Sequence, residues 1–414
     1  MIPDEFAGWR EEQRGWLESV SISDQSHHMR DLFVSGPDAT RLLSDVSANN
    51  YQTFSVGQAK QFIPVTDEGW MIQDGILLRE GDDAYVLTGP SASQNWVLFH
   101  AERGDYQVEF VDDPDSRFRP MGRAPRLFRF QIQGPNALQL VEKVFDGPLP
   151  QTKFFHSTLV SLNGRSFRAL RHSMGGQPGY EFIGDYRDGD YVKARFLLAG
   201  EEFGLVQVGA RAYSVNNLES GWIPTPTAGI YTAPELEAYR QWLSSFSFEA
   251  NNNLHGTWFS EDVEDYYVTP YELGYGRSVS LEHDFVGRDA LQRARDDESQ
   301  RVKVTIVPDV DAARAFFGDE FFLSHARYRI EADGSTIGMT FHTAPIDPLG
   351  EILALALVSP MWQEPGTEVT LVLGEHPGPG SDPEGEDGFT RVGATVAPAP
   401  YSDFARTSYR TAVF

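Results

Sequence analysis

Three segments of this chain concentrate amide, aromatic and charged side chains between apolar runs, and their residues are the ones most able to do chemistry. They are 24–29 (DQSHHM), 175–181 (GGQPGYE) and 208–231 (VGARAYSVNNLESGWIPTPTAGIY). Burying such groups costs free energy unless each finds a partner. A polar turn with satisfied hydrogen bonds would account for any one of these segments. Three of them in one chain favour a single site assembled from distant parts of the sequence.

The side chains of these segments, together with Phe154, suit a flat heteroaromatic ligand. The carboxylate of Glu181 can accept two N–H donors from an amidine-like edge, and the rings of Phe154 and Trp222 can cover the faces of the ligand. The phenol of Tyr213 or the imidazole of His28 can then donate a proton to a leaving oxygen. A pterin fits this set, and a purine fits it as well.

Several other kinds of site are not expected. The chain has no cysteine, which excludes thiol nucleophiles, disulfides and cysteine-ligated metals. It also lacks an HExxH motif, a GxxxxGK[ST] phosphate loop and a GxSxG elbow. His27 and His28 are adjacent, and neighbouring side chains in a strand point to opposite faces, so we expect no metal ion shared between them. The sequence therefore predicts no metal site.

Composition narrows the class of partner. The net charge is −26, with 60 acidic and 34 basic residues, which argues against nucleic acid because its phosphates need basic partners. The first thirty residues are rich in charge, and the apolar run 352–358 has only the length of a strand, so we expect neither a signal segment nor a membrane span. These features predict a soluble, cytoplasmic protein. Its acid-rich, lysine-poor composition fits either a high-salt cytoplasm or an arginine-rich genome.

The elements that must position these side chains include a repeated unit. Segments 32–46 (LFVSGPDATRLLSDV) and 130–144 (FQIQGPNALQLVEKV) share a short apolar strand, a Gly-Pro turn and an amphipathic helix. Pro37 and Pro135 occupy the first helical turn, where proline is favoured. The repeat predicts two related α+β subdomains.

The rest of the chain adds helices, hairpins and a β-rich tail. An amphipathic helix is expected near 6–20, a hairpin over 158–171 with Asn163-Gly164 at its turn, and helices at 190–199 and after 287. The tail contains six short strands separated by Gly, Pro and Asp, which is typical of a small barrel or sandwich. We expect these strands at 302–307, 328–331, 336–341, 352–358, 367–373 and 391–396. The predicted division is a ligand-binding region over 1–300 and a β-domain over 301–414.

The content and order of several segments resemble the folate-dependent aminomethyltransferase (T-protein) family. Within that family the chain most resembles the tetrahydrofolate-dependent aryl O-demethylases of the vanillate/3-O-methylgallate and syringate type. The segments that carry the resemblance are DQSHHMRDLFVSG, AKQFIPVTDEG, FRFQIQGP, KFFHS, LRHSMGGQPGYE, EFGLVQVGARAYSVNNLESGWIPTP, EDYYVTPYELGYG, HDFVGRDAL and APAPYSDFARTSY. Pieces such as DFVGRDAL are common to the whole family, whereas SHHM and RAYSVNNLESGW are more specific to the demethylases.

The resemblance implies an α+β cloverleaf of two related subdomains plus a C-terminal β-barrel, with folate in the central opening. Two interleaved subdomains would then form the folate- and substrate-binding region over 1–300. Glu181 is expected to hold the pyrimidine edge of the pterin of tetrahydrofolate. Trp222 and Phe154 are expected to pack against the folate.

The implied reaction moves a methyl group from an aryl methyl ether to N5 of tetrahydrofolate and gives 5-methyltetrahydrofolate and a phenol. Tyr213 and His28 are the expected catalytic residues. A phenol remains protonated at neutral pH unless perturbed, so Tyr213 can donate a hydrogen bond to the departing oxygen. Gln25, His28 and Tyr213 are expected to line the pocket for a small methylated substrate.

Two departures from the demethylase pattern concern the substrate. An arginine that binds the substrate carboxylate in the vanillate enzymes falls at Pro90, when the chains are anchored on Asn95-Trp96. A second substrate-pocket tyrosine of the family lies upstream of Met1. Proline offers neither charge nor donor, although Arg30, Arg119 or Arg123 could supply charge from another direction.

Two other functions remain open from the sequence. An aminomethyltransferase, or a demethylase of a methylated amine or sulfonium, could use the same scaffold, but its cationic substrate would favour a carboxylate in place of Tyr213. A non-catalytic folate-binding protein is the other alternative. The members of the family that act in iron–sulfur maintenance use a cysteine-containing motif, which this chain lacks.

Overall fold

The two copies of the repeated strand–helix unit belong to two different sheets of the computed structural model, which describes residues 2–382, 385 and 388–412. The units are β2 Arg30–Ser35 with α2 Ala39–Asp45, and β7 Leu127–Gln133 with α4 Ala137–Val144. Gly36 and Gly134 have positive φ values of 124° and 131°. A Cβ atom there would lie 2.5 Å from the carbonyl oxygen of Gln107 and 2.7 Å from that of Ser19. Both turns therefore need glycine, and the predicted repeat is confirmed.

The first lobe is a five-stranded sheet with the order β3-β4-β5-β2-β6. Its remaining elements are β3 Ala59–Phe62, β4 Gly75–Gly81, β5 Ala84–Gly89, β6 Glu109–Asp113 and α3 Ser91–Arg103. Leu32 and Val34 of β2 pack with Leu42 of α2 and Trp96 of α3 in one buried core. The alternate apolar side chains of β2 and the apolar face of α2 thus lie on the same side of the sheet.

The second lobe is a six-stranded sheet with the order β11-β1-β7-β10-β9-β8. Its remaining elements are β1 Val20–Asp24, β8 Ser157–Leu162, β9 Arg165–Leu170, β10 Gly179–Asp185, β11 Leu205–Val208, α1 Trp9–Glu18 and α5 Gly189–Gly200. The predicted opening helix, the hairpin and the second helix are all present. Asn163 and Gly164 have φ values of 48° and 79°, as a two-residue hairpin turn requires.

The third lobe is a closed barrel of six strands with the order β12-β15-β14-β13-β16-β17. The strands are β12 Val302–Pro308, β13 Arg329–Ala332, β14 Ser335–Ile346, β15 Glu351–Val358, β16 Glu368–Leu373 and β17 Thr390–Pro398. All six strands expected in the tail are therefore confirmed, and the barrel is correct. Helix α9, Val310–Phe317, was not expected. Its start is nevertheless encoded by Asp309, whose side chain accepts a hydrogen bond from the Ala312 N–H.

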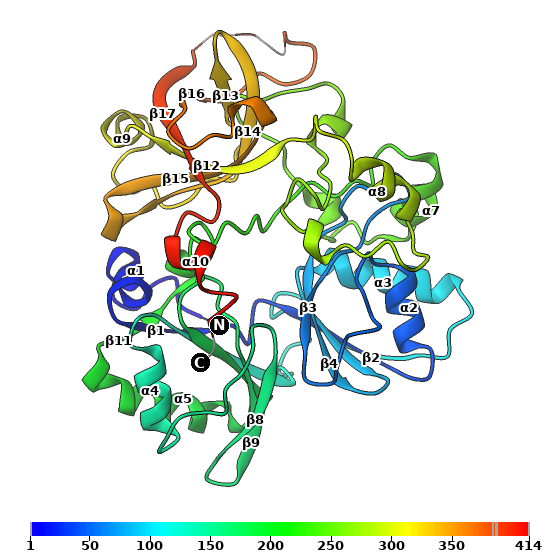
Figure 1. Cartoon of the computed structure of the whole chain (residues 1–414), viewed down its shortest axis with the longest axis vertical. Helices are drawn as coiled ribbons and strands as arrows, with labels where there is room; N and C mark the ends of the chain where they lie inside the picture. The colour runs from blue at the N-terminus through cyan, green and yellow to red at the C-terminus, as the bar shows by residue number, and fades with distance from the viewer. Residues whose placement is uncertain (1, 383–384, 386–387, 413–414) are drawn as a thin grey trace.

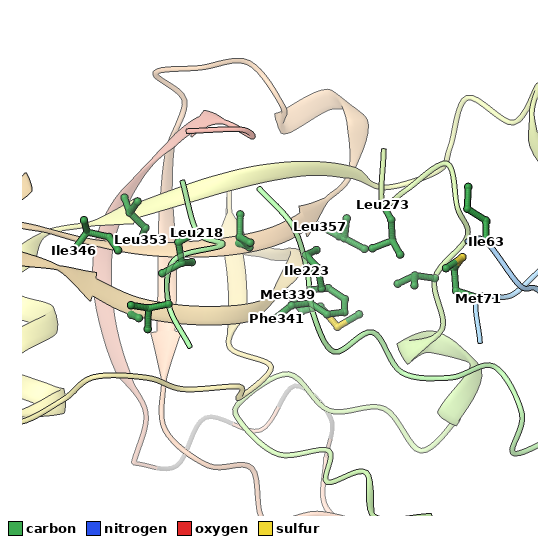
Figure 2. Packing of buried hydrophobic residues seen from close by; sticks show 14 of the residues in the cluster. Ile63, Met71, Leu218, Ile223, Leu273, Met339, Phe341, Ile346, Leu353 and Leu357 are labelled. Carbon is green, nitrogen blue, oxygen red and sulfur yellow. The ribbon is translucent and has the colours of Figure 1, made fainter. Parts of the chain in front are cut away.

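Strand β15 is buried on both of its faces. Ile352, Ala354 and Ala356 belong to the core inside the barrel, whereas Leu353 and Leu355 belong to a second core outside it. Figure 2 shows this outer core, in which side chains of β14 and β15 pack against residues of segments 63–71, 218–223 and 273. The continuous apolar run of β15 is thus explained by two cores that share one strand.

The three lobes surround a central opening, and segment 209–231 runs through it (Figure 1). The remaining helices are α6 Ala210–Tyr213, α7 Glu237–Trp242, α8 Arg288–Ala294 and α10 Asp403–Thr407. The helix expected after 287 is α8. Across the residues that the structure describes, no helix combines the length and the apolar character needed to cross a membrane.

Candidate active site in the central cavity

Strand pairing brings the three polar segments of the sequence together. Strand β1 pairs in parallel with β11, so that Ser23 lies opposite Val208. The segments that follow these two strands, which carry His28 and Tyr213, therefore leave the sheet at the same edge. Strand β7 places Gln131 between Ser23 of β1 and Glu181 of β10. The sheet thereby assembles a site from residues about 190 positions apart.

A single cavity of about 2030 Å³ lies where the lobes meet. Pockets for one small molecule usually measure ~300–1,000 Å³, so this cavity has room for two ligands at once. The six residues singled out from the sequence all line it. They are Gln25, His28, Phe154, Glu181, Tyr213 and Trp222.

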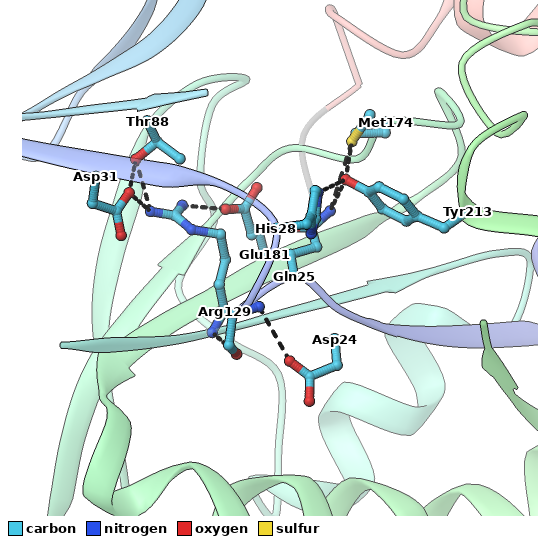
Figure 3. Close-up of polar contacts among 10 residues, drawn as sticks. Asp24, Gln25, His28, Asp31, Thr88, Arg129, Met174, Glu181 and Tyr213 are labelled. Carbon is cyan, nitrogen blue, oxygen red and sulfur yellow. Dashed lines mark hydrogen bonds and ion pairs between the residues drawn. The ribbon is translucent and has the colours of Figure 1, made fainter. Parts of the chain in front are cut away.

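The hydroxyl group of Tyr213 is the centre of a neutral cluster (Figure 3). It accepts a hydrogen bond from Gln25 Nε2 at 3.2 Å and lies 3.1 Å from His28 Nε2. Its own proton points to the sulfur of Met174 at 2.8 Å. A thioether is a weak acceptor, so this proton can be redirected to a better acceptor that enters the cavity. Met174 had not been expected in the site.

The surroundings keep both Tyr213 and His28 uncharged. Burial, with a smaller contribution from Glu181, raises the pKa of Tyr213 well above its ordinary value. Desolvation inside the cavity, together with the positive charge of Arg129, lowers the pKa of His28 to about 4. At neutral pH the tyrosine is a protonated phenol and the histidine a neutral imidazole. Tyr213 is therefore the stronger candidate for proton donation.

The two adjacent histidines do not lie in a strand, contrary to the sequence-based assumption. They occupy the turn between β1 and β2. The rings nevertheless diverge, because His27 Nδ1 is 3.1 Å from Ser116 Oγ whereas His28 contacts Tyr213. Within the described residues, no group of three His, Cys, Asp or Glu side chains could hold a metal ion.

Glu181 is buried against an arginine that the sequence analysis missed. Arg129 Nη1 donates to Glu181 Oε1. Arg129 Nη2 donates to Asp31 Oδ1 at 3.2 Å and to Thr88 Oγ1 at 2.9 Å (Figure 3). The guanidinium thus joins β7 and β10 of the second lobe to β2 and β5 of the first. The available signal was one arginine between two phenylalanines in the buried strand β7.

One oxygen of Glu181 remains available to a ligand. Arg129 binds Oε1, and among the described residues none hydrogen-bonds Oε2. Glu181 lines the cavity although only 2% of its surface is exposed. A buried, charge-balanced carboxylate with a vacant oxygen is a specific acceptor for N–H donors.

Asp74 is a second buried carboxylate that the sequence analysis missed. Its Oδ2 accepts hydrogen bonds from Trp222 Nε1 and from the Tyr275 hydroxyl, both at 2.8 Å, and also from Gln61. Its Oδ1 has no partner among the described residues. Burial raises the pKa of Asp74. Asp74 therefore fixes the edge of the Trp222 indole and offers one acceptor to the cavity.

Aromatic rings form one wall of the cavity. Phe154 stacks on Phe155 with ring centroids 4.3 Å apart and planes at 22°, and Tyr409 meets Phe154 edge-on at 5.2 Å. His172 adds a tilted ring 5.0 Å from Phe155. This wall is suited to cover the face of a flat ring system.

Positive charge is distributed unevenly around the cavity. Lys303 and Arg410 line it near Asp74 and form no ion pair with a described carboxylate, and burial lowers the pKa of Lys303 to about 8. In contrast, Arg30 is bound by Asp112 at 2.7 and 3.0 Å and donates to Asn95 Oδ1 at 2.7 Å. The unpaired cations therefore lie on the Asp74 side.

At the end of the cavity beyond His28, the described residues offer no cation that lacks a carboxylate partner. Pro90 lines it at the start of α3, and Arg117 there is paired with Asp115 at 3.0 Å. Arg119, which the sequence offered as a substitute, is buried against Asp113, and neither it nor Arg123 is among the described residues that line the cavity. The arrangement at this end favours a neutral ligand.

The chain has clear relatives among known proteins. Residues 1–228 match the family model described as "GCVT N-terminal domain". Syringate O-demethylase from Sphingobium sp. (strain NBRC 103272 / SYK-6) is 37% identical, over 99% of this chain and 91% of that protein. Sesamin methylene transferase from Sinomonas sp. (strain No.22) is 26% identical, over 98% of this chain and 92% of that protein. The glycine cleavage system aminomethyltransferase T from Bartonella henselae shares the fold, with a TM-score of 0.65, 17% identity and coverage of 97% of this chain and 91% of that one.

Proposed function

Because this chain belongs to the GCVT (T-protein) aminomethyltransferase family, we propose that it is a tetrahydrofolate-dependent O-demethylase. It moves the methyl group of an aryl methyl ether to tetrahydrofolate and releases a phenol. The observation that carries the proposal is the protonated Tyr213 hydroxyl, which donates its proton to a thioether in the same cavity as the carboxylate of Glu181. The similarity to a syringate O-demethylase supports it.

The residues of the cavity fit tetrahydrofolate. A pterin needs acceptors for its amino and N–H groups, and the oxygen of Glu181 that no described residue binds is such an acceptor. It also needs cover for its ring faces, which Phe154 and Tyr409 provide. The glutamate tail of a folate is anionic, and Lys303 on the Asp74 side can balance that charge.

The protein's own groups account for the remaining requirements of the reaction. When bound, tetrahydrofolate supplies a nucleophilic nitrogen, N5, that accepts the methyl group. Tyr213 turns its hydroxyl from Met174 to the ether oxygen and stabilises the negative charge that develops there. His28 and Gln25 hold the side chain of Tyr213 in place through its hydroxyl oxygen. The cavity can hold the two ligands in the alignment that methyl transfer needs.

A cationic substrate is less well supported. The groups that contact the Tyr213 hydroxyl are an amide, a neutral imidazole and a thioether. None of them carries the negative charge that an ammonium or sulfonium centre would require. The neutral cluster favours an ether over a methylated amine or sulfonium.

The direct test is incubation of the protein with tetrahydrofolate and a panel of methoxylated arenes, followed by mass spectrometry. We expect 5-methyltetrahydrofolate and the matching phenol in equal amounts. A panel that includes methylated amines and sulfonium compounds separates the alternatives. Tight folate binding without transfer from any compound would support a non-catalytic folate-binding protein.

We predict that Glu181→Gln weakens tetrahydrofolate binding by roughly 1.5–3 kcal/mol, the usual worth of a hydrogen bond to a charged group. The amide would place an NH₂ group against the donors of the pterin. Isothermal titration calorimetry of both proteins measures the change. Glu331→Gln, an acidic residue of the barrel that does not line the cavity, is the control. Equal affinities of wild type and Glu181→Gln would mean that the carboxylate does not contact the folate.

We also predict that a neutral methoxyphenol such as guaiacol is demethylated at least as efficiently as vanillate. Pro90 offers no charge, and Arg30 is already bound by Asp112, so a benzoate carboxylate would lose its hydration without a fixed partner. Parallel measurements of kcat/KM decide it. The variant Pro90→Arg should shift the preference toward vanillate by roughly tenfold or more, the worth of one charged hydrogen bond. A strong preference of the wild type for vanillate would contradict the prediction.

A further inference from the structure

We propose that the part of the cavity lined by Phe118 and Phe246 binds a second aromatic ring of the substrate; because both side chains are largely exposed to solvent, this part is called the mouth. This inference rests on the proposed O-demethylation and names its substrate class, a neutral two-ring methoxyarene. The methoxylated ring would reach Tyr213, and the second ring would remain at the mouth.

Two loops form the mouth, and both are tied to the Tyr213 end of the cavity. The loop with Phe118 is held beside His28, because the Ser116 N–H donates to the His27 carbonyl oxygen at 2.8 Å. The loop with Phe246 is held beside Arg30 through Asn95, which donates to Glu249 at 3.1 Å and accepts from Arg30. Phe118 and Phe246 themselves line the cavity. The mouth is therefore continuous with the place where the methyl group would be transferred.

Both rings are presented to solvent by ordered backbone. Phe118 is 54% exposed and Phe246 is 77% exposed. The loop of Phe246 is closed on itself by Asn251, whose Nδ2 donates to the carbonyl oxygens of Ser245 and Ser247 at 2.8 Å each. Single exposed apolar residues are common on protein surfaces, but these two large rings both line one cavity and offer apolar surface that a ligand can cover.

The charges at the mouth select a neutral ligand. The acidic residues there are already neutralised, Asp112 by Arg30 and Asp115 by Arg117. The cavity also exceeds the volume that a folate and a one-ring substrate would occupy. Aromatic pairs prefer stacked or edge-on contacts with centroids ~4.5–7 Å apart, which a second ring between two phenylalanines can make.

The test compares guaiacol with para-benzylguaiacol, which carries the same methoxyphenol and a second ring. We expect kcat/KM for para-benzylguaiacol to exceed that for guaiacol by about tenfold. Phe246→Ala and Phe118→Ala should each reduce this ratio by about threefold to tenfold. Phe316→Ala removes an exposed phenylalanine of α9 that does not line the cavity and should leave the ratio unchanged.

Calorimetry separates this inference from the proposed reaction. Binding of the two demethylated products, catechol and para-benzylcatechol, needs no methyl transfer, and the second ring should improve affinity in the wild type but not in Phe246→Ala. Absence of 5-methyltetrahydrofolate with retained ring-dependent binding would overturn the demethylation only. A ratio near one in the wild type, or an equal loss in Phe316→Ala, would overturn the second-ring site.

Discussion

Replacing Tyr213 with phenylalanine is expected to reduce turnover by about 10²–10⁴, the usual contribution of a positioned proton donor. The ring would keep its edge-on contact with His28 at 4.7 Å between centroids, so packing in the cavity is retained and only the hydroxyl is lost. Tetrahydrofolate affinity should change little. Single-turnover kinetics with guaiacol, and calorimetry with tetrahydrofolate, measure the two quantities separately.

The matched control is Tyr85→Phe. Tyr85 is buried in the first lobe, and its hydroxyl hydrogen-bonds Thr40 at 2.6 Å, outside the cavity. The substitution Tyr85→Phe removes one buried hydroxyl group outside the site, and turnover should remain near that of the wild type. If Tyr213→Phe retained most of its turnover, the phenol would not be the donor and His28 would take its place in the mechanism.

Replacing Arg129 with methionine is expected to lower the free energy of unfolding by about 3–5 kcal/mol, the cost of leaving buried charges without their partner. Asp31 and Glu181 would then face each other across the joint between two lobes. Urea denaturation followed by circular dichroism measures the loss. Arg30→Met is the comparison. Its partner Asp112 is 43% exposed and can be solvated again, although Asn95 loses one hydrogen bond, so the expected cost is smaller, about 1–3 kcal/mol.

The pH dependence gives Arg129→Met a second readout. Burial already raises the pKa of Asp31 above its ordinary value, and loss of the arginine would raise it further. A carboxyl group with a raised folded-state pKa favours the folded state below its unfolded pKa, and this contribution is lost as pH rises through the folded pKa. The difference in free energy of unfolding between wild type and Arg129→Met should therefore become smaller toward acidic pH. A deficit that is constant with pH, or equal to that of Arg30→Met, would contradict the assigned charge balance.

The sequence predicted those parts of the structure that local pattern determines. The strand–Gly-Pro–helix repeat at 32–46 and 130–144 identified the two sheets, because its turn needs glycine at one position in each copy. The tail strands were visible as apolar runs separated by turn residues. Helix α9 was missed, although its Asp309 cap was readable.

Several residues of the candidate site were predictable from the sequence, but the hydrogen bonds and ion pairs between them were not. Glu181 and Tyr213 stood out as polar groups in apolar surroundings, and the strand order β11-β1-β7-β10 explains why they meet. Arg129, Asp74 and Met174 were missed because their partners lie 13 to 201 residues away along the chain. The spacing of neighbouring residues in the sequence does not indicate contacts between residues so far apart. The turn conformation of His27 and His28 was missed because nothing in the apolar pattern marks where β1 ends.

The shared strand β15 has a consequence for how the chain tolerates change. Most strands at a surface have one face on which polar substitutions are nearly neutral. In β15 the side chains of Ala354 and Ala356 fill the barrel, and those of Leu353, Leu355 and Leu357 fill the core that holds the barrel to the other lobes. A larger residue at the alanines would overpack one core, and a smaller or polar residue at the leucines would leave a void in the other. Substitutions in this short stretch are therefore poorly tolerated, although none of its side chains lines the cavity.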